Sequence, residues 1–143
     1  MPKPRVLVVC TGNSMRSQLA EGVLRDELGE QIEVYSAGTH PSSVYPMVIQ
    51  VLEEAGIDTS KHRSKSVTEF LEMEIDLVIT VCDNAEAMCP YMPNAKKRIH
   101  KGYPDPLHRD GTIDTKNAFR ELRDRLRWEL TPLVVKELGL SVN

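Results

Sequence analysis

The chain has 143 residues, of which 41% are hydrophobic and 27% are charged, and its formal net charge is −3. These values are typical of one globular domain with a buried core. Lysine and arginine are scattered along the chain, which argues against a surface for nucleic acid or membranes. The N-terminal apolar run, residues 6–9, is too short for a signal peptide or a membrane span. We therefore expect a single domain over residues 1–143, located in the cytoplasm as a monomer.

The first half of the chain is expected to alternate between strands and helices. A continuous apolar run predicts a strand buried on both faces, and alternating apolar residues predict a second strand. Apolar residues three or four positions apart predict helices. The strands are expected at residues 6–9 and 32–37, and the helices at residues 14–28, 45–55 and 66–73. Ser66 and Glu69 have the spacing of a capping box at the start of the last of these helices.

The second half continues this alternation and ends in a long helix. Strands are expected at residues 75–81 and 97–101, a short helix at residues 83–88 and a loop at residues 102–111. The later strand is the more polar of the two, which suits a sheet edge. From Thr115 onward the pattern is helical. Pro132 is expected to kink this helix, or to start a second helix with Thr131 as its N-cap.

Strands that alternate with helices indicate an α/β fold with a single four-stranded parallel sheet and helices on both faces. In such folds the ligand binds beyond the carboxyl ends of the strands. Cys10 ends the first predicted strand, Cys82 follows the third, and Asp105 follows the fourth. Three chemically useful residues that are far apart in the sequence are thus expected at one end of the sheet.

The loop between the first strand and the first helix combines a nucleophile with an oxyanion cradle. A strand–loop–helix turn directs backbone N–H groups and the positive end of the helix dipole inward, which favours an anion. Arg16 can bind two oxygens of a tetrahedral oxyanion, and the same field favours the thiolate of Cys10, to which Ser17 could donate a hydrogen bond. The expected oxyanion-binding residues are Thr11, Gly12, Asn13, Ser14, Met15 and Arg16. The alternative is an ordinary turn with a buried cysteine.

Asp105, which precedes Pro106, is a candidate general acid. A carboxyl group can protonate a leaving oxygen, and the proline would stiffen the backbone beside it. An aspartate before a proline is also common in turns, so a purely structural role is the alternative.

Cys82 and Cys89 are the other two cysteines, and an odd count in a reducing compartment argues against structural disulfides, so each is expected to be either inert and buried or reactive. If both lay on one straight helix, their Cα atoms would be about 10 Å apart, whereas a disulfide needs about 4.4–6.8 Å. A bond between them would require the segment to unwind, which its small polar residues and Pro90 favour. The alternative is two inert buried thiols. The four histidines have no ligand spacing, so no metal site is expected.

These motifs resemble those of a known family. The stretch Cys10-Thr-Gly-Asn-Ser-Met-Arg16-Ser17-Gln-Leu-Ala-Glu21-Gly, the stretch Ser36-Ala-Gly-Thr39 and the pair Asp105-Pro106 resemble the low-molecular-weight tyrosine phosphatase fold. Cys82 and Cys89, with Pro90 after them, resemble its redox branch, the thioredoxin-coupled arsenate reductases. The resemblance extends over nearly the whole chain, to about Arg127.

The resemblance implies reduction of arsenate to arsenite, and so arsenic detoxification, by a relay of three cysteines. Cys10 attacks arsenate held in the loop of residues 11–16 while Asp105 protonates the departing oxygen. Cys82 then attacks the Cys10 sulfur and releases arsenite, and Cys89 attacks Cys82, leaving a disulfide that thioredoxin reduces. Thioredoxin is thus the electron donor, with no bound cofactor. Phosphate and sulfate compete as oxyanions, and weak phosphatase activity remains.

Two positions depart from the family pattern. Met15 stands where many relatives have a further cysteine, which leaves the mechanism intact. Members that bind potassium have an acidic residue at position 65, beside residues matching Asn13, Glu21 and Ser36. Position 65 is a lysine here. We therefore expect Lys65 to offset Glu21, and we expect no potassium dependence.

Two other functions remain open. A phosphatase acting on phosphotyrosine or small phosphoesters would need only Cys10, as a phosphocysteine, with Arg16 and Asp105. Leu107 and His108, however, offer no aromatic wall for phosphotyrosine. A non-catalytic oxyanion-binding or redox-responsive module would bind arsenate or phosphate without turnover.

Overall fold

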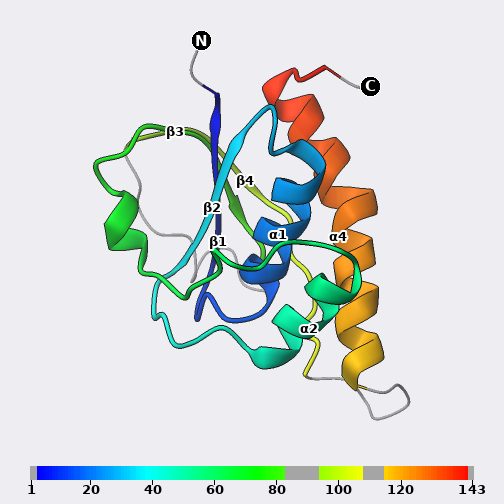
Figure 1. Cartoon of the computed structure of the whole chain (residues 1–143). Helices are drawn as coiled ribbons and strands as arrows, with labels where there is room; N and C mark the ends of the chain where they lie inside the picture. Colours follow the sequence, from blue (N-terminus) through cyan, green and yellow to red (C-terminus); the bar gives the residue numbers. More distant parts are fainter. Residues whose placement is uncertain (1–2, 83–93, 108–114, 142–143) are drawn as a thin grey trace.

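The sheet consists of four parallel strands in the order β2-β1-β3-β4. The structure, a computed structural model, describes residues 3–82, 94–107 and 115–141. The strands are β1 (Arg5–Cys10), β2 (Glu33–Gly38), β3 (Ile75–Thr80) and β4 (Ala95–His100). This confirms the predicted four-stranded parallel sheet, with strand ends within two residues of those expected, and it places β4 at an edge (Figure 1).

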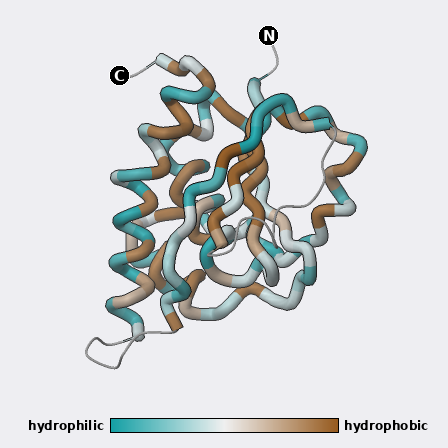
Figure 2. The backbone as a smooth tube through the Cα atoms, turned by 180° about the vertical axis from the view of Figure 1, so that it is seen from behind, coloured by the Kyte–Doolittle hydropathy of each residue, from teal (hydrophilic) through white to brown (hydrophobic). Residues whose placement is uncertain are grey.

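Strand β1 is buried on both of its faces. Val6 and Val8 pack into the hydrophobic cluster on one side of the sheet, and Leu7 and Val9 pack into the cluster on the other. All four side chains are fully buried. Figure 2 shows apolar residues concentrated along the central strands. The continuous apolar run at the N-terminus is therefore explained by burial of the strand on both faces, as predicted.

Three helices cover one face of the sheet: α1 (Arg16–Leu28), α2 (Pro46–Glu54) and α4 (Thr115–Leu138). In the described part of the chain, the opposite face is covered by the 3₁₀-helix η1 (Val67–Phe70) and its neighbours, to the left of the sheet in Figure 1. The helix predicted at residues 83–88 lies outside the described residues. No helix within the described ranges is long and apolar enough to cross a membrane.

The short helix η1 has the predicted N-cap but is shorter than the predicted range 66–73. The side-chain oxygen of Ser66 accepts a hydrogen bond from the Thr68 N–H at 3.2 Å. The Glu69 carboxylate pairs with Arg63 at 2.7 Å and also accepts a hydrogen bond from the Ser66 backbone N–H. The expected pairing of Ser66 with Glu69 at the start of this helix is therefore confirmed.

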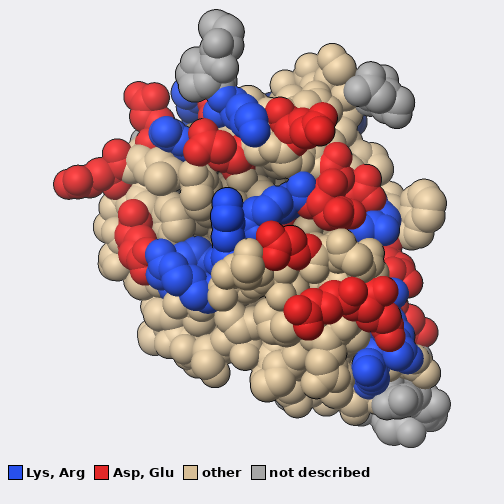
Figure 3. Space-filling view, in the orientation of Figure 1, with Lys and Arg blue, Asp and Glu red and all other residues tan. Residues whose placement is uncertain are grey.

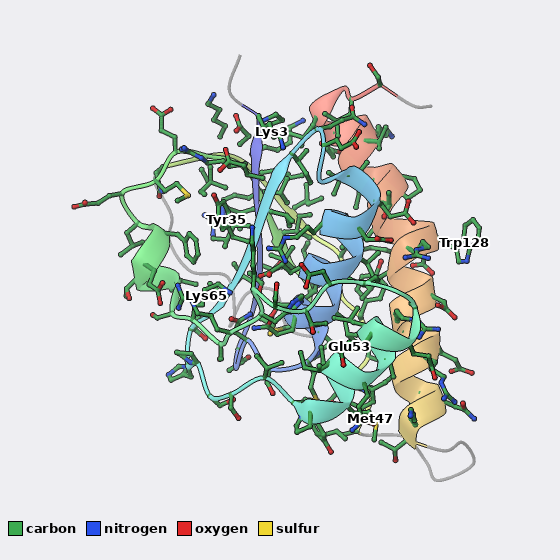
Figure 4. All side chains as sticks on the ribbon, viewed as in Figure 1. Lys3, Tyr35, Met47, Glu53, Lys65 and Trp128 are labelled. Carbon is green, nitrogen blue, oxygen red and sulfur yellow. The ribbon has the colours of Figure 1, made fainter. Side chains whose placement is uncertain are left out.

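Helix α4 continues through Pro132, so the prediction of a second helix starting there is wrong. A proline inside a helix costs about 3 kcal/mol. Leu130 and Val134, on either side of it, are both fully buried, and burial of each such side chain contributes about 1.5–3 kcal/mol. Packing against the core thus outweighs the lost backbone hydrogen bond. On the opposite side of α4, Trp128 projects into solvent and is 77% exposed (Figure 4).

Candidate active site

The loop between β1 and α1 holds Cys10 at one end and Arg16 at the other. It lies at the carboxyl end of β1, next to the carboxyl end of β3, because these two strands pair in parallel. Cys82 follows β3 by two residues, and its thiol is hydrogen-bonded to the sulfur of Cys10. The sheet thus places the first two cysteines together although they are 72 positions apart in the chain.

The backbone carbonyls of the loop are bound on its outer side. Three N–H groups from the segment after β2 donate to them: His40 to Thr11 (2.8 Å), Ser42 to Gly12 (3.0 Å) and Tyr45 to Ser14 (3.1 Å). Because the N–H of a trans peptide points opposite to its carbonyl, this arrangement turns the loop N–H groups inward. Inward-pointing N–H groups are what a loop needs to bind an anion, so this geometry suits the role expected for residues 11–16.

Gly38, the last residue of β2, is required for this close packing. A Cβ atom at this position would lie 2.5 Å from the carbonyl oxygen of Thr11 and 2.8 Å from the backbone nitrogen of Asn13. Neither backbone atom can move without distorting the loop. Only glycine fits, and this contact was not predictable from the sequence because it joins segments 25 or more positions apart.

Cys10 is the ionised member of the cysteine pair. Its pKa is lowered to about 5, first by the hydrogen bond from Cys82 and then by those from the Ser17 hydroxyl and the backbone N–H groups of Ser17 and Asn13, which together outweigh burial. The Ser17 oxygen lies 2.9 Å from the sulfur. The pKa of Cys82 is raised by the same hydrogen bond and by burial. At neutral pH the pair therefore holds one thiolate, on Cys10, and one thiol.

A cavity of about 270 Å³ lies against the Cys10 loop. It is lined by Cys10, Thr11, Gly12, Ser14, Met15, Arg16 and Ser42. A tetrahedral oxyanion fits a cavity of this size. The Arg16 guanidinium donates at 3.0 Å to the carbonyl oxygen of Tyr103, in the loop after β4. Ser42 and Tyr103 were not recognised in the sequence, because neither belongs to a local motif.

Asp105 lies in the same loop as Tyr103, two residues further on. It is half-buried, and its carboxylate accepts a hydrogen bond from the Leu107 N–H at 2.9 Å. It is not among the residues that line the cavity. The carbonyl that binds Arg16 is nonetheless only two residues away, so the loop connects the cradle with the candidate acid. Cys89 lies outside the described residues.

A buried polar network supports the loop from behind. The Asn13 amide donates to the hydroxyls of Ser17 (2.8 Å) and Ser36 (2.9 Å). The Ser36 hydroxyl donates to Glu21 at 2.6 Å, and the Lys65 ammonium lies 3.4 Å from the same carboxylate oxygen. The expected pairing of Lys65 with Glu21 is thereby confirmed.

Burial raises the pKa of Glu21, but the charge of Lys65, the hydrogen bond from Ser36 and the charge of Arg25 more than compensate, so this pKa lies below its ordinary value. The carboxylate is therefore ionised at neutral pH. Among the described residues, no group of three or more histidines, cysteines or acidic residues is arranged to hold a metal ion. Figure 3 shows acidic and basic side chains interspersed over the face that it presents.

An ionised cysteine beneath a cavity of this kind defines a class of enzymes that attack tetrahedral oxyanions through sulfur. The chain belongs to the low molecular weight phosphotyrosine protein phosphatase family, whose model matches residues 5–142. It is similar to an arsenate reductase of Halalkalibacterium halodurans, with 41% identity over 127 residues, which make up 88% of this chain and 91% of that protein.

Two solved structures extend the comparison. One is an arsenate reductase in the phosphate binding state, with a TM-score of 0.74 and 30% identity, covering 93% of this chain and 98% of that chain. The other is a thioredoxin-dependent arsenate reductase of Corynebacterium glutamicum, with a TM-score of 0.67 and 30% identity, covering 93% of this chain and 64% of that chain. Both have the fold described above.

Proposed function

We propose that this protein reduces arsenate to arsenite and passes the oxidising equivalent through its cysteines to thioredoxin. The observation that carries the proposal is the buried pair of Cys10 and Cys82, in which a thiolate accepts a hydrogen bond from a thiol. A phosphatase needs only the first sulfur, whereas a reductase needs a second thiol within reach of the first. The similarity to arsenate reductases supports the same function.

The first step is attack of the Cys10 thiolate on arsenic. Arsenate is held by the loop N–H groups and by Arg16. The Arg16 guanidinium gives up its hydrogen bond to the Tyr103 carbonyl and binds two oxygens of the substrate. The bond between arsenic and a hydroxyl oxygen breaks, and Asp105 donates one proton to this hydroxyl, which leaves as water. The product is a thioester-like adduct between the Cys10 sulfur and arsenic(V).

The second step transfers two electrons. The Cys82 sulfur attacks the Cys10 sulfur, and the sulfur–arsenic bond breaks with its electron pair going to arsenic, which leaves as arsenite. The Cys82 proton is released, and a disulfide joins Cys10 to Cys82. Two thiols have then lost two electrons, as the change from arsenic(V) to arsenic(III) requires.

The third step moves the disulfide to where thioredoxin can reach it. Cys10 and Cys82 are only 4% and 2% exposed, so an external dithiol cannot approach a disulfide between them. Attack of Cys89 on Cys82 would regenerate Cys10 and produce a Cys82–Cys89 disulfide, which thioredoxin reduces by exchange. A reducing, cytoplasmic setting suits this cycle, because it keeps all three cysteines reduced at rest.

The test is arsenate turnover with thioredoxin, thioredoxin reductase and NADPH, beside hydrolysis of an aryl phosphate. Wild type, Cys10→Ser, Cys82→Ser and Cys89→Ser are compared. All three substitutions should stop arsenate turnover, and only Cys10→Ser should abolish hydrolysis. Normal turnover by Cys89→Ser with thioredoxin would show that the third thiol is misassigned.

Hydrolysis of phosphoesters through a phosphocysteine at Cys10 is the second candidate function, because the family is one of phosphatases and the cradle suits phosphate equally well. Efficient aryl phosphate hydrolysis without arsenate turnover would establish it as the main activity. Arsenate or phosphate binding without either turnover would indicate a binding or redox-responsive module instead.

A further inference from the structure

The peptide bond that follows Asn13 is held differently from the other peptides of the loop between β1 and α1. The carbonyls of Thr11, Gly12 and Ser14 accept hydrogen bonds from backbone N–H groups of the segment after β2. The carbonyl of Asn13 accepts instead from a side chain, the Gln18 amide of α1, at 3.0 Å. Within the described ranges it has no other donor. One side chain therefore makes a contact that the backbone supplies elsewhere in the loop.

The Gln18 side chain is fully buried, and the orientation of its amide is settled by its contacts. One amide atom contacts two carbonyl oxygens, that of Asn13 and, at 2.8 Å, that of Arg63. A carbonyl oxygen can only accept, so the atom that contacts both is the nitrogen. The other amide atom, the oxygen, is buried and has no partner among the described residues. The contacts of this amide are therefore those of a donor.

The bond from Gln18 sets the direction of the next N–H group in the loop. The carbonyl and the N–H of a trans peptide point in opposite directions. A carbonyl of Asn13 that is bound from α1, behind the loop, therefore turns the N–H of Ser14 toward the front. Ser14 lines the cavity, whereas Asn13 and Gln18 do not. The Ser14 N–H is thus presented to an oxyanion in the cavity, to which it can donate a charge-assisted hydrogen bond.

Asn13 has a φ of 47°, the only positive value among the non-glycine residues that the structure describes. This left-handed conformation costs free energy in a residue with a Cβ atom, but it turns successive N–H groups to one side, as in anion-binding concavities. The Asn13 side chain is held by Ser17, Ser36 and the N–H of Lys65. These contacts do not fix the following peptide, which can turn as a unit about its two flanking Cα atoms. The Gln18 amide supplies the missing restraint.

We propose that Gln18 is a positioning residue for the oxyanion cradle, whose amide binds the Asn13 carbonyl and thereby directs the Ser14 N–H into the substrate cavity. The inference rests on the role proposed above for this loop as the oxyanion site. Its tests are phosphate binding and alkylation of Cys10, neither of which requires the disulfide relay. The two proposals can therefore fail independently.

The proposal separates oxyanion binding from ionisation of the nucleophile. The Cys10 thiolate accepts hydrogen bonds from Cys82, from the Ser17 hydroxyl and from the backbone N–H groups of Ser17 and Asn13. None of these donors belongs to the peptide that follows Asn13. Loss of the Gln18 amide should therefore weaken oxyanion binding and leave the ionisation of Cys10 unchanged, whereas a general disturbance of the loop would alter both.

Two substitutions distinguish the donor from the volume of the side chain. Gln18→Met keeps nearly the same length, removes the donor and leaves no room for water beside the Asn13 carbonyl. Gln18→Ala also removes the donor but opens space for water, which can donate to that carbonyl. We expect both variants to fold, because the Arg63 carbonyl keeps its hydrogen bond from the Lys65 ammonium at 2.9 Å and the unpartnered Gln18 oxygen is removed as well.

Ser64→Ala is the matched control. The Ser64 hydroxyl also donates to a carbonyl of the loop, that of Gly12, at 3.0 Å. This carbonyl, however, has a second donor, the Ser42 N–H, at 3.0 Å. The control thus removes a side-chain hydrogen bond from the same loop without leaving its acceptor unpaired.

The experiment measures the rate at which iodoacetamide alkylates Cys10, with each cysteine resolved by mass spectrometry and folding verified by circular dichroism. The dependence of the rate on inorganic phosphate gives a dissociation constant, because bound phosphate shields the sulfur, and its dependence on pH gives the ionisation of Cys10. We expect phosphate to bind about tenfold more weakly to Gln18→Met, as loss of one hydrogen bond to a charged group implies. The loss should be smaller in Gln18→Ala and absent in Ser64→Ala. The midpoint of the pH profile should stay in place in all three variants.

Equal phosphate affinity in wild type and folded Gln18→Met would overturn the proposal and leave the relay untouched. A larger loss in Gln18→Ala than in Gln18→Met would also overturn it, since affinity would then follow the packing of the side chain. So would a shift of the pH midpoint that accompanied the loss of affinity, since the loop as a whole would then be disturbed. A wild-type protein that binds phosphate but does not reduce arsenate would overturn the relay alone.

Discussion

The Cys82 side chain is expected to have two separable roles: hydrogen-bond donor to the Cys10 thiolate and attacking thiol in the relay. Cys82→Ala removes both roles, whereas Cys82→Ser removes only the second, because a hydroxyl also donates. The hydrogen bond from Cys82 is the largest of the effects that lower the pKa of Cys10 to about 5. The two variants should therefore differ in the ionisation of Cys10 although neither reduces arsenate.

The magnitude follows from the strength of that hydrogen bond. A hydrogen bond to a charged group contributes about 1.5–3 kcal/mol, and a thiol is a weak donor, so the lower limit applies. This corresponds to about a tenfold change in the ratio of thiolate to thiol. The pKa of Cys10 should rise in Cys82→Ala, because loss of a hydrogen-bond donor destabilises the charged form.

The assay is the pH profile of Cys10 alkylation, with intact folding verified by circular dichroism, because the exposed Trp128 does not report on the core. In Cys82→Ala the midpoint should rise by about one pH unit. In Cys82→Ser it should stay within a few tenths of a unit of wild type. If the alanine variant kept the wild-type midpoint, Cys82 would not be the donor, and the thiolate would depend on Ser17 and the loop N–H groups alone.

Three further outcomes are expected. The pKa of Cys10 is depressed on folding, so its contribution to the free energy of unfolding is complete above pH 9 and is lost as the pH falls toward 5, by at most about 1.4 kcal/mol per pH unit. Urea unfolding at several pH values should show this slope in wild type, and a flatter one in Cys10→Ser. Gly38→Ala should lower the free energy of unfolding by about 1–3 kcal/mol and reduce turnover, because its Cβ would meet the Thr11 carbonyl at 2.5 Å. Potassium chloride should change neither turnover nor melting temperature relative to choline chloride, because the Lys65 ammonium lies 3.4 Å from Glu21.

Each of these has a contrary result. If the free energy of unfolding had the same pH slope in wild type and Cys10→Ser, a group other than Cys10 would cause the pH dependence. A Gly38→Ala variant as stable as wild type would mean that the loop yields to the added methyl group. A rise in turnover that is selective for potassium would show that a cation binds despite Lys65.

The proposed disulfide relay accounts for the combination of burial and reactivity at this site. A buried thiolate is protected from adventitious oxidants and is stabilised by fixed donors in place of water. The cost is that an oxidised Cys10 cannot be reduced directly from outside. In the proposed relay, Cys82 and then Cys89 resolve this conflict, and the positions of Cys10 and Cys82 account for the first half of that path.

Much of the fold was predictable because its signals are local. Strands β1 and β3 were located from continuous apolar runs, since strands buried on both faces are apolar almost throughout. The loop from Cys10 to Arg16 was recognised because a nucleophile, a cradle and a helix start lie within seven residues. The continuation of α4 through Pro132 was not predictable, because it depends on how Leu130 and Val134 pack against other elements.

The sequence by itself determined which chemical groups this protein has and at which end of the sheet they lie, because the direction of parallel strands follows from alternation with helices. The tertiary structure alone decided how those groups act on one another. Which cysteine is ionised depends on donors that approach Cys10 from the segment after β3, from α1 and from within the loop. That Lys65 faces Glu21 depends on a contact across 44 residues. Hydrogen bonds and charges act over a few ångströms in space, and only the folded chain sets those distances.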